Sequence, residues 1–215
     1  MTQIKDWTLH RPENTAFLPC RMVTGERSMT ILEILYQRRS VREYTAEPVS
    51  RETLTQLIDA AIQAPSAMNE QPWHFTVVTD RSLLSRISER AKAYLMEEFD
   101  ESSHMDHISQ TLGDPQFQIF YHAPALIVIS APKSSQWVVE DCAMAAQNLM
   151  LAAQAMKLGT CWIGFAQSWL NTDEGRAAIG LAETQIPVAP IIAGHPKGKP
   201  PAIPRRKPDV NWIGS

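Results

Sequence analysis

The chain of 215 residues is short of the features that mark several large protein classes. Its only cysteines are Cys20, Cys142 and Cys161, which form no CxxC pair and no zinc-type spacing, so we expect neither a disulfide framework nor structural zinc. The formal net charge is -3, too acidic for a general basic field that would attract nucleic acid. No uninterrupted apolar run suits a signal peptide or a membrane span. We expect a cytoplasmic protein with neither a nucleic-acid nor a membrane partner.

Common catalytic motifs are missing as well. The sequence has no GxGxxG after a strand, no GxxxxGK[ST], no GxSxG and no HExxH, which excludes the usual dinucleotide, P-loop, hydrolase and zinc-protease sites. His104 and His107 have a helical metal-ligand spacing but no evident third ligand. We therefore expect no metal site, and no side-chain acid or base stands out.

What the chain does have is one dominant apolar segment, residues 138–165. Its apolar residues occupy most of the helical circumference, which predicts a buried helix that ends at Lys157 and Gly159. The following residues, Thr160 to Phe165, have the composition of a strand. The length of the chain suits a single α/β domain packed around this helix.

Hydrophobic periodicity predicts the other elements. Helices are expected from Thr30 to Gln37, after the N-cap Ser50, over 82–121 with a break at 113–115, and over 169–179. Strands are expected at 73–78, 125–130 and 188–193, and we expect the second to lie beside the Trp162 strand. Residues 1–28 are interpreted as an N-terminal arm, and 29–215 as one domain with an extended proline-rich C-terminal arm.

Three polar clusters remain as candidate sites. In Arg38-Arg39-Ser40-Val41-Arg42, alternate residues of an extended segment point the same way, so Arg38, Ser40 and Arg42 could converge on an anion; cations at a helix end are the simpler interpretation. Ser66, Asn69 and Gln71, between Pro65 and Pro72, could line a polar ligand or satisfy their own loop. Lys199, Arg205, Arg206 and Lys207 form a third, basic cluster in the tail, which could hold a ligand or be solvated; a proline-rich peptide ligand for a partner is a lesser option.

These motifs, in this order, resemble the nitroreductase family of FMN-dependent oxidoreductases. The resemblance covers residues 30–208 and rests on RRSVR, PSAMNEQPW, the long helix ending Leu158-Gly159 before Trp162-Ile163-Gly164-Phe165, and Arg205-Arg206. It implies an α/β (α+β) fold with a central, mostly antiparallel sheet flanked by helices, assembled as an intertwined homodimer. It also implies two tightly bound FMN molecules at the dimer interface.

The resemblance implies roles for individual residues. Arg38, Ser40 and Arg206 resemble phosphate and ribityl ligands, Arg39 contributes through its backbone, and Arg42 resembles the cation beside the flavin N1/C2=O edge. From the other subunit, Pro65, Ser66, Asn69 and Gln71 resemble cofactor-lining residues. Ile163 and Gly164 resemble the backbone segment near flavin N5, although many members carry glutamate at the first position. The spacing leaves Arg205 open as the alternative to Arg206.

The implied reaction is a ping-pong transfer in which NAD(P)H gives hydride to FMN N5 and a nitroaromatic, quinone or similar small acceptor is then reduced. An alternative is a family member with narrow chemistry, such as reductive dehalogenation or dehydrogenation of one metabolite. A less favoured alternative is a regulatory dimer that binds flavin without turnover. The sequence leaves open the acceptor, the choice of NADH or NADPH, the role of residues 1–28 and the lid residues within 90–122.

Overall fold

Four antiparallel strands form the centre of the molecule. The computed structural model describes residues 29–98 and 106–214. The strands are β1 (His74–Val78), β2 (Ala125–Pro132), β3 (Gly159–Trp162) and β4 (Gln185–Gly194), in the order β1-β2-β4-β3. The mostly antiparallel sheet is therefore confirmed.

Two expectations about the sheet were wrong. β2 does not lie beside the Trp162 strand, because β4 pairs with both and separates them. β3 also stops at Trp162 rather than Phe165, since a short 3-10 turn, Gly164–Ala166, begins just beyond it. β2 and β4 are both buried along most of their length, so their sequences alone could not show which one neighbours β3.

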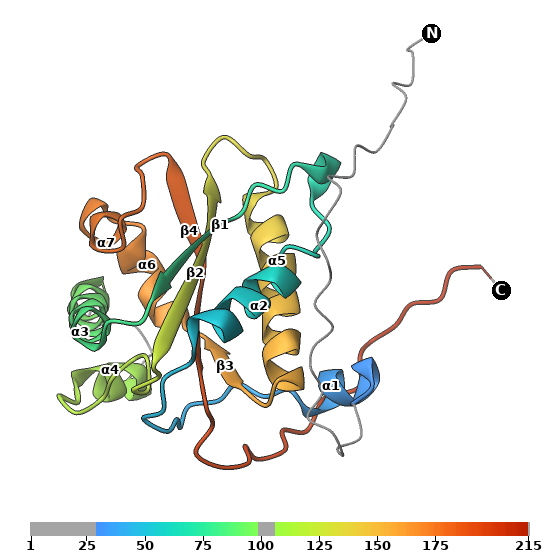
Figure 1. Cartoon of the computed structure of the whole chain (residues 1–215), viewed down its shortest axis with the longest axis horizontal. Coiled ribbons are helices and arrows are strands. Elements are labelled where there is room, and N and C mark those ends of the chain that lie inside the picture. Colours follow the sequence, from blue (N-terminus) through green and yellow to red (C-terminus); the bar gives the residue numbers. More distant parts are fainter. Residues whose placement is uncertain (1–28, 99–105, 215) are drawn as a thin grey trace, which may run out of the picture.

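Helices cover both faces of the sheet (Figure 1). On one face, α2 (Arg51–Ala61) packs against α5 (Val138–Ala155), and their buried side chains form one core with β2 and β4. On the other face lie α3 (Arg81–Glu98), α4 (Asp106–Gly113), α6 (Gln167–Leu170) and α7 (Asp173–Ala178), over a second core. The single helix expected over 169–179 is in fact two, because Thr172 caps the N-terminus of α7 with its hydroxyl.

The central helix α5 is buried on one side only. Its face toward the sheet includes Cys142, Ala145 and Leu149, which are completely buried, whereas Val139 and Met144 are exposed. Complete burial of this helix within one chain was therefore a wrong expectation. The exposed side is mixed, because it carries Glu140 and Gln147 as well as these two apolar residues.

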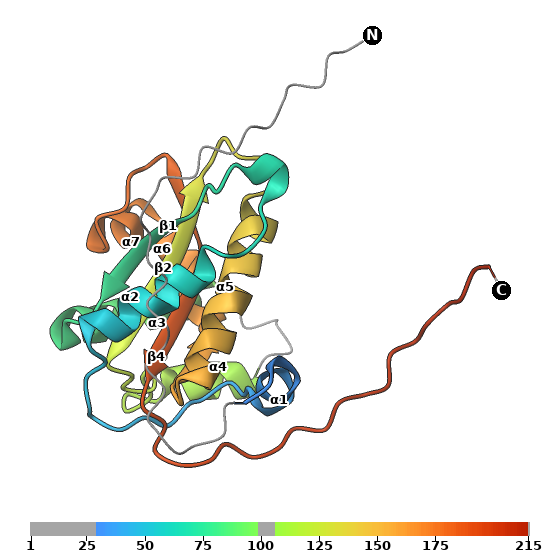
Figure 2. The ribbon, with the colours of Figure 1, turned by 45° about the vertical axis from the view of Figure 1, so that its right-hand side comes forward.

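More apolar side chains are exposed on α1 (Ile31–Gln37) and on the C-terminal arm. α1 exposes Leu32 and Tyr36, the latter 77% accessible, and Trp212 and Ile213 on the arm are 87% and 90% accessible. The arm runs away from the body of the molecule, as Figure 2 shows. None of the helices in the described part of the chain is long and apolar enough to cross a membrane. The N-terminal arm, residues 1–28, lies outside the described residues.

Candidate functional site

The RRSVR segment is fixed against the edge of the sheet. Ser40 forms a parallel bridge with Thr160 of β3, and the Val41 N–H donates to the Thr160 carbonyl at 3.0 Å. The segment approaches so closely that a Cβ on Gly159 would lie 2.7 to 2.8 Å from three side-chain carbons of Val41. Glycine at the start of β3 therefore lets the RRSVR segment join the sheet.

The alternate residues of this segment differ in their surroundings. Val41 is buried in the core, while the charges of Arg38 and Arg42 and the hydroxyl of Ser40 act on the thiol of Cys161 on β3. Burial raises the pKa of Cys161, and Arg42, the Ser40 hydroxyl and Arg38 act against that rise. Two cations and a hydroxyl thus act on one thiol of β3.

Arg39 has a structural role. Its guanidinium donates to the carbonyls of Tyr36 at 2.7 Å and Arg38 at 2.8 Å, so it satisfies the C-terminal end of α1. The helix-end interpretation is therefore confirmed for this residue. The Nε of Arg39 is buried and has no hydrogen-bond partner in the described part of the chain.

The C-terminal arm completes a pocket of about 340 Å³ beside this segment. The residues that line it come from 39–43 and from the arm: Arg39, Ser40, Val41, Arg42, Glu43, Gly198, Lys199, Pro200, Pro201 and Ile203. Backbone hydrogen bonds from Thr45 to His195 and from Lys197 to Glu43 hold the two segments together.

Arg205 extends the cationic cluster. Burial, then the positive charge of Arg205, then that of Arg39 lower the pKa of Arg38. Among the ion pairs of residues 29–98 and 106–214, none joins a carboxylate to Arg38, Arg42 or Arg205. Arg205, and not Arg206, is among the charges that lower the pKa of Arg38.

The two candidate residues in the turn after β3, Ile163 and Gly164, differ in their exposure. The Ile163 side chain is buried, its N–H donates to the Pro190 carbonyl at 2.8 Å, and its carbonyl accepts from Ala166. Gly164 is exposed, and a Cβ built there would meet no atom within 4 Å. Gly164 is therefore the group of this turn that a ligand can approach.

The polar loop 65–72 has a well-defined local structure. Ser66 Oγ accepts from the Gln71 N–H at 2.9 Å, and the Gln71 side chain donates to Asn69 Oδ1 at 3.1 Å. Met68, Asn69 and Gln71 all have positive φ, a conformation that non-glycine residues adopt at a cost. The loop residues thus satisfy one another, and Pro65 is exposed beside them.

Asp141, which the sequence did not single out, ties this loop to α5. The carboxylate is only 4% exposed, and its Oδ1 accepts from the Ala67 N–H at 2.9 Å. Its Oδ2 has no partner among the described residues. An acidic residue in a strongly apolar helix was the available sequence signal, because a buried charge needs a specific partner.

The two predicted halves of the site do not meet within one chain. Loop 65–72 contacts the first turn of α5, whereas the RRSVR segment pairs with the strand that follows the helix's last turn. Figure 1 shows them at opposite ends of α5, which at 18 residues is about 27 Å long. The two predicted halves, called half-sites below, are therefore separate within one chain.

Tyr121 is a second residue that sequence reasoning missed. The guanidinium carbon of Arg42 lies 5.9 Å from the centroid of the Tyr121 ring. Tyr121 and its neighbour His122 both have positive φ. The segment lies within the 90–122 region, whose sequence carries no recognisable motif.

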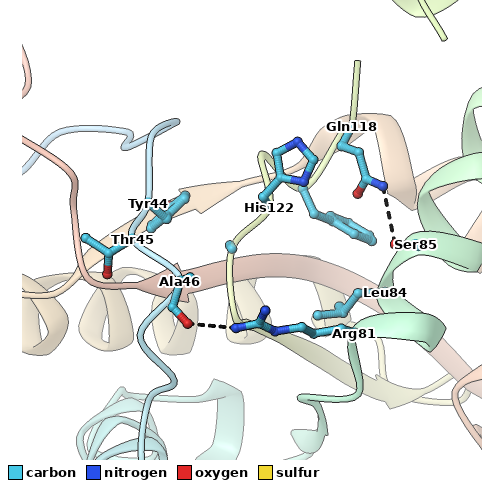
Figure 3. A pocket seen from close by; sticks show the side chains of 10 residues that line it. Tyr44, Thr45, Ala46, Arg81, Leu84, Ser85, Gln118 and His122 are labelled. Atoms are coloured by element: carbon cyan, nitrogen blue, oxygen red, sulfur yellow. Dashed lines mark hydrogen bonds between the residues drawn. The ribbon is translucent and has the colours of Figure 1, made fainter. Parts of the chain in front are cut away.

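Figure 3 shows a second pocket, of about 230 Å³, on the α3 side of the 44–46 segment. Its polar groups pair with one another: Arg81 donates to the Ala46 carbonyl at 2.7 Å, and Gln118 donates to Ser85 at 3.3 Å. These bonds brace α3 against its neighbours. The pocket beside RRSVR, whose cations lack acidic partners, is the better candidate for a charged cofactor.

Comparison with known proteins places the chain in a family. A protein from Archaeoglobus fulgidus, described by its name as a candidate NADH dehydrogenase or NAD(P)H nitroreductase, is 33% identical over 77% of this chain and 85% of its own length. A nitroreductase from Bacteroides fragilis, solved with bound FMN, is 27% identical with a TM-score of 0.71 and covers 86% of this chain and 97% of its own. An iodotyrosine deiodinase from Thermotoga neapolitana is 27% identical over 60% of this chain and 71% of its own length. The nitroreductase family model matches residues 35–195, and the chain belongs to the nitroreductase family.

Proposed function

We propose that this protein is an FMN-dependent oxidoreductase that takes hydride from NAD(P)H and passes it to a nitroaromatic, a quinone or a related small acceptor. The relatives named for NAD(P)H and the B. fragilis structure with FMN support this reaction type and this cofactor. The observation in this chain that carries the proposal is the order of groups along β3. A cofactor with a phosphate at one end and a reactive ring at the other needs different groups in a fixed order.

The parallel pairing of Ser40 with Thr160 sets that order. Arg38 lies toward the start of β3, Arg42 toward its end, and the exposed Gly164 lies beyond. Gly164 lies two residues beyond the end of β3, at the start of the 3-10 turn. A phosphate at the Arg38 end and a flavin ring beside Arg42 and Gly164 fit this arrangement.

The cationic end suits a phosphate for electrostatic reasons. Arg38 and Arg205 repel one another, and the described residues provide no carboxylate that pairs with either. A bound dianion would relieve this repulsion and accept hydrogen bonds from both guanidinium groups. Arg39, whose Nε is buried without a partner, lies in the same wall.

At the other end, Arg42 supplies positive charge. When bound, FMN accepts hydride at N5 while negative charge develops at its N1/C2=O edge. Arg42 would stabilise this charge from the rim of the pocket, and no protein nucleophile is required. Gly164 leaves space for close approach at the N5 side, whereas the Ile163 amide is already engaged.

We further propose that the active unit is a homodimer in which loop 65–72 of one subunit completes the pocket of the other. The half-sites lie at opposite ends of α5, and the apolar faces of α1, α5 and the arm are exposed in the single chain. A complementation experiment tests this directly. Co-expressing Arg38→Ala and Asn69→Ala subunits should restore one intact flavin site per heterodimer, and no gain over either parent would contradict a shared site.

The flavin reaction has its own test. Purified protein should be yellow, release FMN on denaturation, and bleach anaerobically with NADH or NADPH. A colourless protein that neither binds added FMN nor oxidises nicotinamide would overturn the proposed function. Binding of FMN without reduction by either nicotinamide would instead indicate a regulatory flavoprotein. A cytoplasmic location stays a prediction.

A narrower reaction is the second candidate. The T. neapolitana relative is named an iodotyrosine deiodinase, so reductive dehalogenation occurs on a related sequence. Stopped-flow oxidation of the reduced enzyme by nitroaromatics, quinones and halogenated phenols separates the two. Saturation with a single class, and slow second-order oxidation by the others, would favour the narrow reaction.

A further inference from the structure

We propose that Tyr121 is the positioning residue that holds the Arg42 guanidinium at the rim of the flavin pocket. This inference rests on the proposed function, because it assigns a purpose to the Arg42 charge. It concerns a residue of the 117–122 turn, which lies on a different element from the RRSVR segment.

Arg42 needs an external constraint. Its side chain is exposed, and no ion pair ties it to a carboxylate within the described residues. Arginine has a long side chain with many rotamers, so its backbone position alone does not fix its charge. Charge stabilisation of a reaction is effective only when the charge is already in place.

The Tyr121 ring supplies such a constraint. The ring centroid lies 5.9 Å from the Arg42 guanidinium carbon, within the range of a cation–π contact. Tyr121 is partly buried against the core on the α3 side of the sheet. The ring therefore offers Arg42 a fixed electron-rich surface.

The turn that carries Tyr121 is itself held firmly. Tyr121 and His122 have φ of 51° and 56°, a left-handed conformation that persists only where the surroundings enforce it. Ile119 and Phe120 anchor the turn in the core, being 0% and 1% exposed, and the Ile119 N–H donates to Ser88 of α3 at 3.1 Å.

Neighbouring groups set the direction of the ring. Phe117 meets Tyr121 edge-on, with centroids 5.6 Å apart and an interplanar angle of 80°. The Tyr121 N–H donates to the Gln118 carbonyl at 2.9 Å. Backbone strain, core anchors and an aromatic neighbour thus combine to place one ring over one cation.

The first test needs no flavin. In protein labelled with ¹³C,¹⁵N-arginine, the Arg42 side-chain resonances should show an upfield ring-current shift, assigned by their loss in Arg42→Ala. Tyr121→Phe should retain the shift, and Tyr121→Leu should remove it. The matched control is Tyr94→Leu, which deletes a partly buried ring of α3 that does not face Arg42. An unchanged Arg42 spectrum in Tyr121→Leu would overturn the proposal, whether or not the protein binds flavin.

The second test measures the consequence on the flavin-loaded enzyme. Replacing Tyr121 with phenylalanines carrying zero to three fluorines weakens the cation–π contact stepwise at nearly constant shape. The rate of hydride uptake per bound FMN and the flavin midpoint potential should fall along the series, the rate by about two- to fivefold. The dissociation constant of FMN should change less than the rate. In an Arg42→Ala background the trend should vanish, and a trend that persisted there would show that the ring acts on the flavin without Arg42.

Discussion

Replacing Gly159 with alanine tests whether the flavin pocket depends on the close approach of the RRSVR segment to β3. The new methyl carbon would lie 2.7 to 2.8 Å from three Val41 carbons, where about 3.5–4.0 Å is comfortable. Gly159 does not have a left-handed φ, so alanine meets no backbone penalty there. We expect Gly159→Ala to lower the free energy of unfolding by about 1–3 kcal/mol through overpacking.

The Val41→Ala change provides the rescue. Alone, it should destabilise the core by about 1–2 kcal/mol, because it removes two buried methyl groups. Combined with Gly159→Ala, it removes two of the three clashing carbons, so the double variant should be at least about 1 kcal/mol more stable than additivity allows.

Urea unfolding followed by circular dichroism measures the free energy of unfolding of the wild type, the two single variants and the double variant. FMN titration shows whether displacement of the RRSVR segment weakens cofactor binding in the pocket. Gly113→Ala is the matched control, since a Cβ there meets no atom within 4 Å. Strictly additive free energies, or an equal loss in the control, would refute the claim that Gly159 is required by the contact with Val41.

Three further predictions concern individual side chains. Arg205→Ala should weaken FMN binding about tenfold or more by removing a charge-assisted contact, and Arg206→Ala should weaken it less; equal losses in titrations would contradict the assignment. Arg42→Ala should slow flavin reduction by NAD(P)H more than it weakens FMN binding, and the reverse pattern in stopped-flow would contradict its role. Burial raises the pKa of Cys142 from 9.0 to about 12, so the unfolded thiol ionises first and stability should fall as pH rises above 9. By pH 10.5 the free energy of unfolding should have fallen by about 1–2 kcal/mol more in the wild type than in Cys142→Ala. Urea unfolding that gave the same pH dependence for both proteins would disprove it.

Local chemistry made many elements predictable from sequence. The Ser50 hydroxyl accepts from the Thr53 N–H and begins α2 where the N-cap rule places it. The continuous apolar run at 125–130 is a strand buried on both faces. Alternation within RRSVR likewise predicted that Val41 faces away from Ser40 and Arg42, because the period of an extended segment is fixed by its backbone, and Val41 is indeed buried in the core.

Long-range features were not predictable in the same way. β2 and β4 have equally buried, apolar sequences, and the choice of β3's neighbour depends on how the whole sheet assembles. Which arginine of the arm acts on Arg38 depends on the path of the arm past that residue, which spacing to a proline cannot encode. Tyr121 was missed because its importance comes from a contact across 79 positions, with no motif around it.

The two half-sites also constrain how subunits could pair. Loop 65–72 lies at the N-terminal end of α5 and the RRSVR segment beside the strand that follows its C-terminal end, so the length of the helix, about 27 Å, lies between them. A two-fold axis that packed the exposed face of α5, with Val139 and Met144, against its copy in antiparallel orientation would place each loop beside the partner's RRSVR segment. The same pairing would cover apolar side chains that one chain leaves in water. The apolar circumference of the helix is then explained by two partners, the sheet on one side and a second helix on the other.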